Sequence, residues 1–130
     1  MPEYSDILYE TDGRLAFITL NRPEKLNALS NNLRAEVMDA MREAESDDEV
    51  GVIVLRGNGR SFSAGYDLTP SRSADDDSFV SHRSKLPDTG SMHPGANQWA
   101  RHVVMTNWII WELAKPVVCQ IQGHCLAGGT

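Results

Sequence analysis

Two short segments rich in small residues carry the chemistry that this sequence could perform. The first, Phe62–Leu68, follows the apolar run Val50–Leu55, and the second, Gly123–Gly129, follows the apolar run Val117–Ile121. A loop of small residues at the end of a strand can leave a main-chain N–H group uncovered. Two such N–H groups that meet at one point form an oxyanion hole, which stabilises negative charge on a carbonyl oxygen. The sequence therefore predicts an oxyanion-binding site made of main-chain donors.

Other kinds of site find little support. Gly57 and Gly59 begin a dinucleotide-like pattern, but Phe62 occupies the position of its last glycine and no helical pattern follows at once. The sequence contains neither a P-loop nor the nucleophile elbow of serine hydrolases. Cys119 and Cys125 match no zinc or redox spacing, so we expect buried free thiols and no metal site.

Apolar patterning predicts the elements that must position the two loops. We expect strands at residues 7–10, 14–20, 50–55 and 117–121, the first two joined by an Asp-Gly turn and the third fully buried. A helix is expected over 31–46, with Ser30 as its N-cap and Arg34 on its polar side. A second helix, 97–114, carries tryptophans that we assign to the core or to a subunit interface. The polar segment 69–96 is expected to be a long loop, either lining a pocket or disordered.

Composition and charge narrow the class of protein. The chain has 130 residues, of which 41% are hydrophobic, and a net charge of −6. This length suits one globular domain, and the acidic balance argues against nucleic acid as a partner, because phosphate neutralisation needs clustered Lys and Arg. No apolar stretch is long enough to span a membrane, and the polar N-terminal segment resembles no targeting peptide. We therefore expect a cytoplasmic protein with no membrane partner.

Four segments in order resemble the enoyl-CoA hydratase/isomerase (crotonase) superfamily. They are Asn21–Leu29, Phe62–Leu68, Lys115–Val117 and Gly123–Gly129. The resemblance covers nearly the whole chain except about 69–96. It implies an α/β fold, the crotonase-like (ClpP/crotonase) spiral of ββα units, incomplete at the C-terminus. Residues 1–130 would be the N-terminal part of the spiral core with a polar insertion at about 69–96, and the rest of the core and the C-terminal trimerisation helices would be absent.

The resemblance also implies roles for particular residues. The main-chain N–H groups of Ala64 and Gly128 would form the oxyanion hole, where small side chains allow close approach. The residues that would border coenzyme A are Glu24, Lys25, Leu26, Ala64, Gly65, Tyr66 and Asp67. Lys25 would meet a phosphate or be a solvated lysine, and Asp67 would line the cofactor or be a structural cap. Ala127 stands where the family has a glycine, which is tolerable unless the position needs a positive φ, and Tyr66 is bulky enough to narrow the acyl tunnel.

The activity implied by the resemblance is addition of water to a 2-enoyl-CoA, in fatty-acid or related acyl-CoA metabolism. Coenzyme A would be part of the substrate, with no tightly bound cofactor, and the full-length parent would be a homotrimer or a dimer of trimers. The catalytic carboxylates would lie beyond Thr130, so the 130-residue chain itself is expected to be inactive. Isomerisation or other thioester chemistry of the family is an alternative. The others are a non-catalytic truncated interaction module and a nucleotide-binding regulatory domain suggested by Gly57 and Gly59.

Overall fold

The structure is a computed structural model that describes residues 3–67, 103–104 and 106–130. The polar insertion expected at about 69–96 lies outside the described residues. So do Leu68 and the first part of the second expected helix, residues 97–102. The fold that follows is therefore that of the remaining segments, which contain both candidate loops up to Asp67.

A four-stranded sheet carries the two loops at its strand ends. β1 (Ile7–Asp12) pairs antiparallel with β2 (Leu15–Leu20), whereas β3 (Val52–Gly57) pairs parallel with β2, and β4 (Val117–Gln120) pairs parallel with β3. The strand order is therefore β1-β2-β3-β4. Gly13 makes the β1–β2 turn with φ of 57°, a conformation that glycine adopts without a Cβ clash. The expected hairpin and both later strands are confirmed, with ends shifted by one or two residues.

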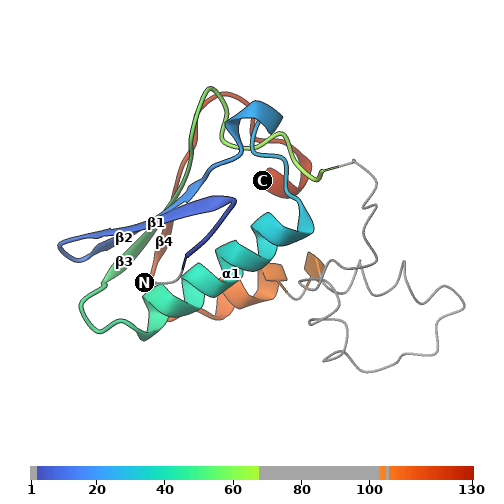
Figure 1. Ribbon diagram of the computed structural model, residues 1–130. Coiled ribbons are helices and arrows are strands. Elements are labelled where there is room, and N and C mark those ends of the chain that lie inside the picture. Colours follow the sequence, from blue (N-terminus) through green and yellow to red (C-terminus); the bar gives the residue numbers. More distant parts are fainter. Residues whose placement is uncertain (1–2, 68–102, 105) are drawn as a thin grey trace, which may run out of the picture.

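One long helix lies across a face of this sheet (Figure 1). α1 (Asn31–Ser46) contacts β1 and β2 and connects β2 to β3. The Ser30 hydroxyl accepts a hydrogen bond from the N–H of Leu33 at 3.1 Å, so the expected N-cap is confirmed. The order strand, strand, helix, strand is that of a ββα unit followed by the strand of the next unit.

The hydrophobic core fills the space between α1 and the sheet. Its fully buried members include Ile18 on β2, Leu33 and Met41 on α1, and Ile53 on β3. The apolar residues expected to share one face of α1 are all buried: Leu33, Val37, Met38, Met41 and Ala44. Arg34 was expected on the polar side, and this is wrong, because a second helical segment covers that flank of α1. Arg34 is only 7% exposed and its Nη2 donates to Thr106 Oγ1.

Residues 103–104 and 106–112 are helical and run beside α1 (Figure 1). After them, Lys115 holds the end of α1, since its Nζ donates to the carbonyl oxygens of Ala44 at 2.7 Å and Asp47 at 2.6 Å. The tryptophans of this helix were expected in the core or at a subunit interface; the core is wrong for two of them, and the interface stays a prediction. Trp108 and Trp111 are 54% and 80% exposed, with their rings stacked 6.4 Å apart. Trp111 contributes to the wall of a cavity despite its exposure.

The later strands are less buried than their apolar sequences suggested. On β3 only Ile53 is fully buried, and β4 is half-buried at Val117 and exposed beyond it. Among the described strands, β4 has a neighbour on one side only, and its Val118 is 52% exposed. Cys119 on the same strand is exposed, and Cys125, which follows the strand, is half-buried, so the expectation of two buried cysteines is wrong, although both are free.

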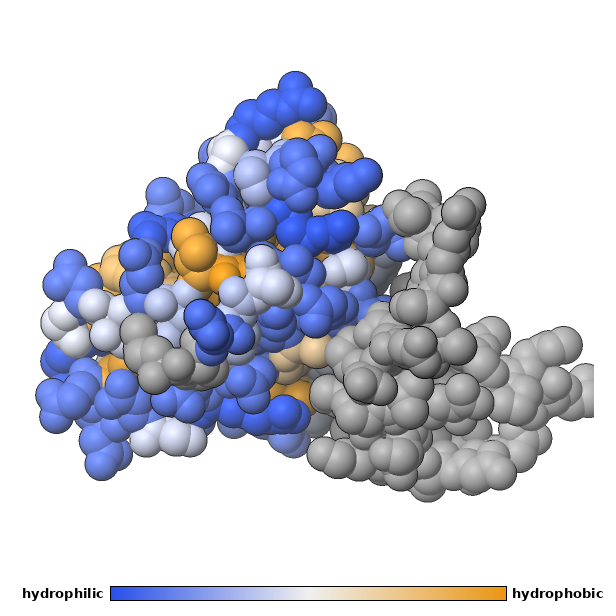
Figure 2. Space-filling model, in the orientation of Figure 1, coloured by the Kyte–Doolittle hydropathy of each residue, from blue (hydrophilic) through white to orange (hydrophobic). Residues whose placement is uncertain are grey.

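The visible face of the molecule is mostly hydrophilic, with scattered apolar side chains (Figure 2). Single exposed apolar residues of this kind are normal on folded proteins. Within the described segments, no helix is both long enough and apolar enough to cross a membrane.

Candidate functional site

The two loops predicted to act together lie side by side. The N–H of Phe62 donates to Gln122 O at 2.7 Å, and the N–H of Ser63 donates to His124 O at 3.0 Å. In return, the N–H of Leu126 donates to Ser63 O at 3.2 Å. These bonds form a parallel bridge between Ser63 and Cys125, which fixes the register of one loop against the other.

A third segment, residues 21–29, completes the site. The N–H of Leu29 donates to Gly65 O at 2.7 Å, and the N–H of Asp67 donates to Leu29 O at 3.2 Å. The carbonyl oxygen of Leu26 accepts from the N–H of Ala64 at 2.9 Å. All three segments in which sequence reasoning placed functional residues therefore meet along one line of main-chain hydrogen bonds.

A buried asparagine organises this meeting. Asn27 is fully buried; its Oδ1 accepts from the N–H of Arg22 at 2.8 Å, and its Nδ2 donates to Asn58 O at 2.9 Å and to Ser61 O at 3.0 Å. Its own carbonyl oxygen accepts from Ser63 Oγ at 2.9 Å. Asn27 has a φ of 53°, and asparagine is one of the few non-glycine residues that adopts such a value readily. Sequence reasoning did not single it out.

The N–H groups of Ala64 and Gly128, the predicted donors, are in different situations. The N–H of Ala64 is bonded to Leu26 O. In the turn η2 (Ala127–Gly129), the N–H of Gly129 donates to Leu126 O and that of Thr130 to Ala127 O, whereas the N–H of Gly128 has no recorded acceptor among the described residues. Of the two predicted donors, only the N–H of Ala64 is therefore bonded to an acceptor within the described part of the chain.

Close packing explains why glycine is needed in both loops. Gly65 has a φ of 96°, and a Cβ there would lie 2.8 Å from Leu126 O. A Cβ at Gly128 would overlap the ring of Tyr66. The bulky ring of Tyr66 therefore rests against the main chain of Gly128, beside the proposed oxyanion donor.

The other residues expected to border coenzyme A lie around the rim. Glu24 and Lys25 are exposed on the short 3-10 helix η1 (Pro23–Lys25), and Leu26 follows with a φ of 51°. Asp67 is held 3.1 Å from the guanidinium of Arg22 in an ion pair, which ties the end of the 62–67 loop to the segment before η1. The structure thus gives Asp67 a structural contact and leaves Lys25 at the surface.

Ala127 adopts a φ of 47°, the left-handed region in which a Cβ is unfavourable. We therefore expect Ala127→Gly to stabilise the chain by about 1 kcal/mol, because glycine adopts this conformation without the Cβ clash. Urea denaturation measures the change. Ala114→Gly is the matched control, since Ala114 is exposed and has a negative φ, and it should give no gain. Equal effects of the two substitutions would contradict strain at Ala127.

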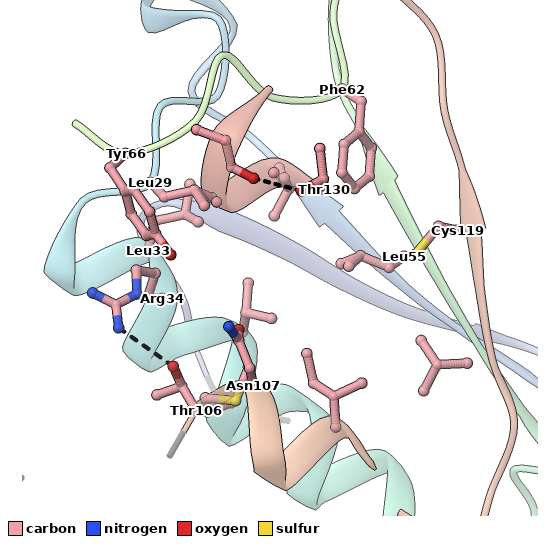
Figure 3. Close-up of a pocket in the computed structure, with 18 of the residues that line it drawn as sticks. Leu29, Leu33, Arg34, Leu55, Phe62, Tyr66, Thr106, Asn107, Cys119 and Thr130 are labelled. Atoms are coloured by element: carbon pink, nitrogen blue, oxygen red, sulfur yellow. Dashed lines mark hydrogen bonds between the residues drawn. The ribbon is translucent and has the colours of Figure 1, made fainter. Parts of the chain in front are cut away.

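A cavity of about 760 Å³ opens beside η2, between α1, the sheet and the helical residues 106–112 (Figure 3). Ala127, Gly128 and Gly129 form part of its wall. Most of the remaining lining is apolar and includes Leu29, Leu33, Val37, Leu55, Phe62 and Val117. An apolar cavity beside main-chain donors suits a ligand with a polar carbonyl head and a hydrocarbon tail.

Arg34, Thr106 and Tyr66 line the same cavity, and sequence reasoning missed the first two. The guanidinium of Arg34 lies 3.3 Å from Thr106 Oγ1 and 5.8 Å from the centre of the Tyr66 ring. Burial lowers the pKa of Arg34, and the nearby Tyr66 acts in the opposite direction. Cys119 is exposed as a residue but lines the cavity, and the partial burial of its thiol there raises its pKa, with Cys125 adding to the effect. A raised pKa disfavours the thiolate, which is the nucleophilic form.

The described residues provide neither a carboxylate in the cavity wall nor a cluster of metal ligands. No aspartate or glutamate is among the described residues that line the cavity. No group of three or more potential metal ligands occurs in the segments that the structure covers. The described lining of the cavity therefore offers no carboxylate for proton transfer.

Comparison with known proteins agrees with this geometry. Residues 10–130 match the family model described as enoyl-CoA hydratase/isomerase. EchA13 of Mycobacterium tuberculosis, named as a candidate enoyl-CoA hydratase, is 38% identical over 98% of this chain and 42% of its own length. The hydroxycinnamoyl-CoA hydratase-lyase of Pseudomonas fluorescens is 32% identical over 97% of this chain and 41% of its own length.

Solved structures give the same result for the fold. The structure of an enoyl-CoA hydratase/isomerase from Xanthobacter autotrophicus Py2 superimposes with a TM-score of 0.72 at 34% identity, covering 98% of this chain and 42% of that one. The chain thus spans about two fifths of the length of the proteins it matches. The expected α/β spiral fold, incomplete relative to these proteins, is confirmed.

Proposed function

The chain belongs to the enoyl-CoA hydratase/isomerase family, and we propose that it binds an acyl-CoA thioester whose carbonyl oxygen is held by the N–H groups of Ala64 and Gly128. The observation that carries this proposal is the register of the two loops, in which the Ser63–Cys125 bridge places the 62–67 loop against η2 beside an apolar cavity. The acyl chain occupies the cavity, and coenzyme A leaves over the rim formed by Glu24, Lys25 and Leu26.

The chemistry served by such a site is stabilisation of a thioester enolate. Negative charge develops on the thioester oxygen when a nucleophile adds to the acyl chain, and also when the acyl chain loses a proton. Each main-chain donor aimed at that oxygen contributes about 3–4 kcal/mol to the stability of the transition state. In this proposal the N–H of Gly128 donates to the thioester oxygen. The N–H of Ala64 either leaves its present acceptor, Leu26 O, or donates to both oxygens at once.

We assign hydration of a 2-enoyl-CoA to the whole protein, with carboxylates from residues that follow Thr130 as general acid and base. Double-bond isomerisation uses the same oxyanion hole with a different arrangement of acids. One of the relatives, 31% identical, is named 1,2-epoxyphenylacetyl-CoA isomerase. A cytoplasmic homotrimer or dimer of trimers is the assembly that we propose for the whole protein.

Titration of the chain with crotonyl-CoA, with coenzyme A as the reference ligand, tests the proposed binding. We expect crotonyl-CoA to bind, and its thioester carbonyl stretch to shift to lower frequency, because two N–H donors polarise the C=O bond. We expect the whole protein, and not the 130-residue chain, to hydrate crotonyl-CoA. Loss of the absorbance of the conjugated enoyl group measures this reaction. If no acyl-CoA binds to the chain, the proposal is contradicted. If the 130-residue chain alone hydrates crotonyl-CoA, the proposal that the catalytic carboxylates follow Thr130 is refuted.

A further inference from the structure

One asparagine of the chain is followed directly by glycine. Asn58 and Gly59 lie in the bend that follows β3, and both are exposed. In such a pair the main-chain nitrogen of the glycine can attack the asparagine side chain, because glycine has no Cβ to hinder the approach. The bend rests against η1, since a Cβ at Gly59 would lie 2.8 Å from Pro23 Cβ. The reactive pair is therefore at the surface, yet beside a segment of the candidate site.

The surroundings of this pair favour the reaction. Gly59 has a φ of 88°, and within the described segments its N–H has no recorded acceptor. The carbonyl oxygen of Asn58, in the same peptide group, accepts a hydrogen bond from Asn27 Nδ2 at 2.9 Å. When the nitrogen of Gly59 loses its proton, negative charge spreads onto that oxygen, where a hydrogen-bond donor stabilises it. Asn27 thus stabilises the anion from which the reaction starts.

We propose that Asn58 deamidates spontaneously, and that this change weakens acyl-CoA binding at the two loops. The deprotonated nitrogen of Gly59 attacks Cγ of Asn58, so that a bond between these two atoms forms and the bond from Cγ to Nδ2 breaks. Nδ2 leaves as ammonia with a proton from water, and a cyclic imide remains. Water then adds to one of the two imide carbonyls and opens the ring. The product at position 58 is aspartate, or isoaspartate in which the main chain runs through Cβ and Cγ.

The amide that is lost holds the segment before η1. Asn58 Nδ2 donates to Asn21 Oδ1 at 2.9 Å, and the N–H of Asn58 donates to Leu20 O at 2.8 Å. Both products lack the NH₂ group, so Asn21 Oδ1 loses its donor. In isoaspartate the former main-chain carbonyl of Asn58 also becomes a carboxylate, which changes the acceptor of Asn27 Nδ2. These contacts belong to segment 21–29, which completes the site.

A further contact ties the bend to the other loop. Gln122 Nε2 donates to the carbonyl oxygens of Gly57 at 2.7 Å and Gly59 at 3.1 Å, on either side of residue 58. Isoaspartate lengthens the main chain between these two oxygens by one methylene group, so Gln122 no longer matches both. The carbonyl oxygen of Gln122 in turn accepts from the N–H of Phe62 at 2.7 Å. The effect on binding therefore rests on the proposed function, whereas the deamidation itself does not.

Peptide mass mapping of the full chain tests the deamidation. Trypsin cleaves after Arg56 and Arg60 and releases the peptide Gly57–Arg60, in which Asn58 is the one asparagine. The peptide Leu26–Arg34 is the internal reference, since none of its asparagines precedes glycine. The chain is incubated in mildly alkaline buffer until a urea-unfolded sample has converted. Gly57–Arg60 from the folded chain should by then have gained the mass difference between OH and NH₂, and sooner than the reference.

An unchanged Gly57–Arg60 in the folded chain overturns the proposal, as does a change no faster than that of the reference peptide. Asn58→Gln is the matched variant. It keeps an amide at this position but closes the imide ring far more slowly, because that ring needs one more atom. The mass of its peptide 57–60 should therefore stay constant through the same incubation.

Affinity for crotonyl-CoA, measured before and after incubation, tests the consequence for binding. The converted chain should bind about tenfold more weakly, the effect of losing a hydrogen bond that holds the site together. The Asn58→Gln variant should keep its own initial affinity. Full affinity in the converted chain, or an equal loss in Asn58→Gln, overturns the link between Asn58 and binding. If the unconverted chain does not bind crotonyl-CoA, the proposed function is contradicted, and the peptide masses still decide the deamidation.

Discussion

Replacement of Gly128 by proline in the whole protein is expected to lower enoyl-CoA turnover by about 10²–10³-fold, the effect of removing one oxyanion donor. Proline has no main-chain N–H, so the open donor of η2 is lost. Steady-state hydration of crotonyl-CoA measures the change. Gly13→Ala is a suitable control, because Gly13 also has a positive φ but a Cβ there meets nothing within 4 Å. That variant should lose some stability and keep its turnover.

The Gly128→Ala variant distinguishes the contribution of the N–H donor from that of the free space beside it. This variant retains the N–H but places a Cβ into the ring of Tyr66. We expect a reduced downward shift of the thioester carbonyl stretch in bound crotonyl-CoA, and recovery of that shift when Tyr66→Ala is added. Near-normal turnover in a folded Gly128→Pro variant would show that Gly128 is not an oxyanion donor. An unreduced shift in Gly128→Ala would show that Tyr66 does not crowd this position.

Local signals were sufficient to predict the first ββα unit. Asp12 and Gly13 form the expected turn, and Ser30 begins α1 at the expected residue, because hairpin turns and N-caps depend on a few neighbouring residues. The pairing of the two loops was also predictable, but only through resemblance to a family. Neither glycine spacing nor strand patterns specify which loops meet.

What escaped prediction depends on residues distant in the sequence. Whether Arg34 is buried is decided by the helical segment around Thr106, 72 residues later, and not by the pattern of α1. The exposure of Trp111 likewise depends on which segments cover the helix, and periodicity reports only that one face is apolar. For Asn27 a signal existed, since asparagine adopts positive φ more readily than most residues, but two of its three side-chain hydrogen bonds go to the distant residues Asn58 and Ser61.

Asn27→Ala is expected to cost about 3 kcal/mol in the free energy of unfolding, one of the largest effects for a single side chain here. The substitution leaves the carbonyl oxygens of Asn58 and Ser61 and the N–H of Arg22 without their present partner. The buried group among them, Ser61 O, costs about 1–3 kcal/mol when unpaired, and the two part-buried groups cost less. Urea denaturation gives the value. Asn31→Ala, at the first position of α1, is the control and should change stability by no more than about 0.5 kcal/mol.

Two further substitutions divide this cost between the side chain and the backbone. Asn27→Gly removes the same hydrogen bonds but tolerates the φ of 53°, so it should be less destabilising than Asn27→Ala by about 1 kcal/mol. Asn27→Asp keeps an acceptor for the N–H of Arg22 but cannot donate to Asn58 O or Ser61 O. Because Ser63 Oγ donates to the carbonyl of Asn27 and accepts from the N–H of Gly65, all three variants should also weaken acyl-CoA binding. Wild-type stability in Asn27→Asp would mean that the two donated bonds contribute nothing, and unchanged affinity would mean that the loop carrying Ala64 is positioned without Asn27.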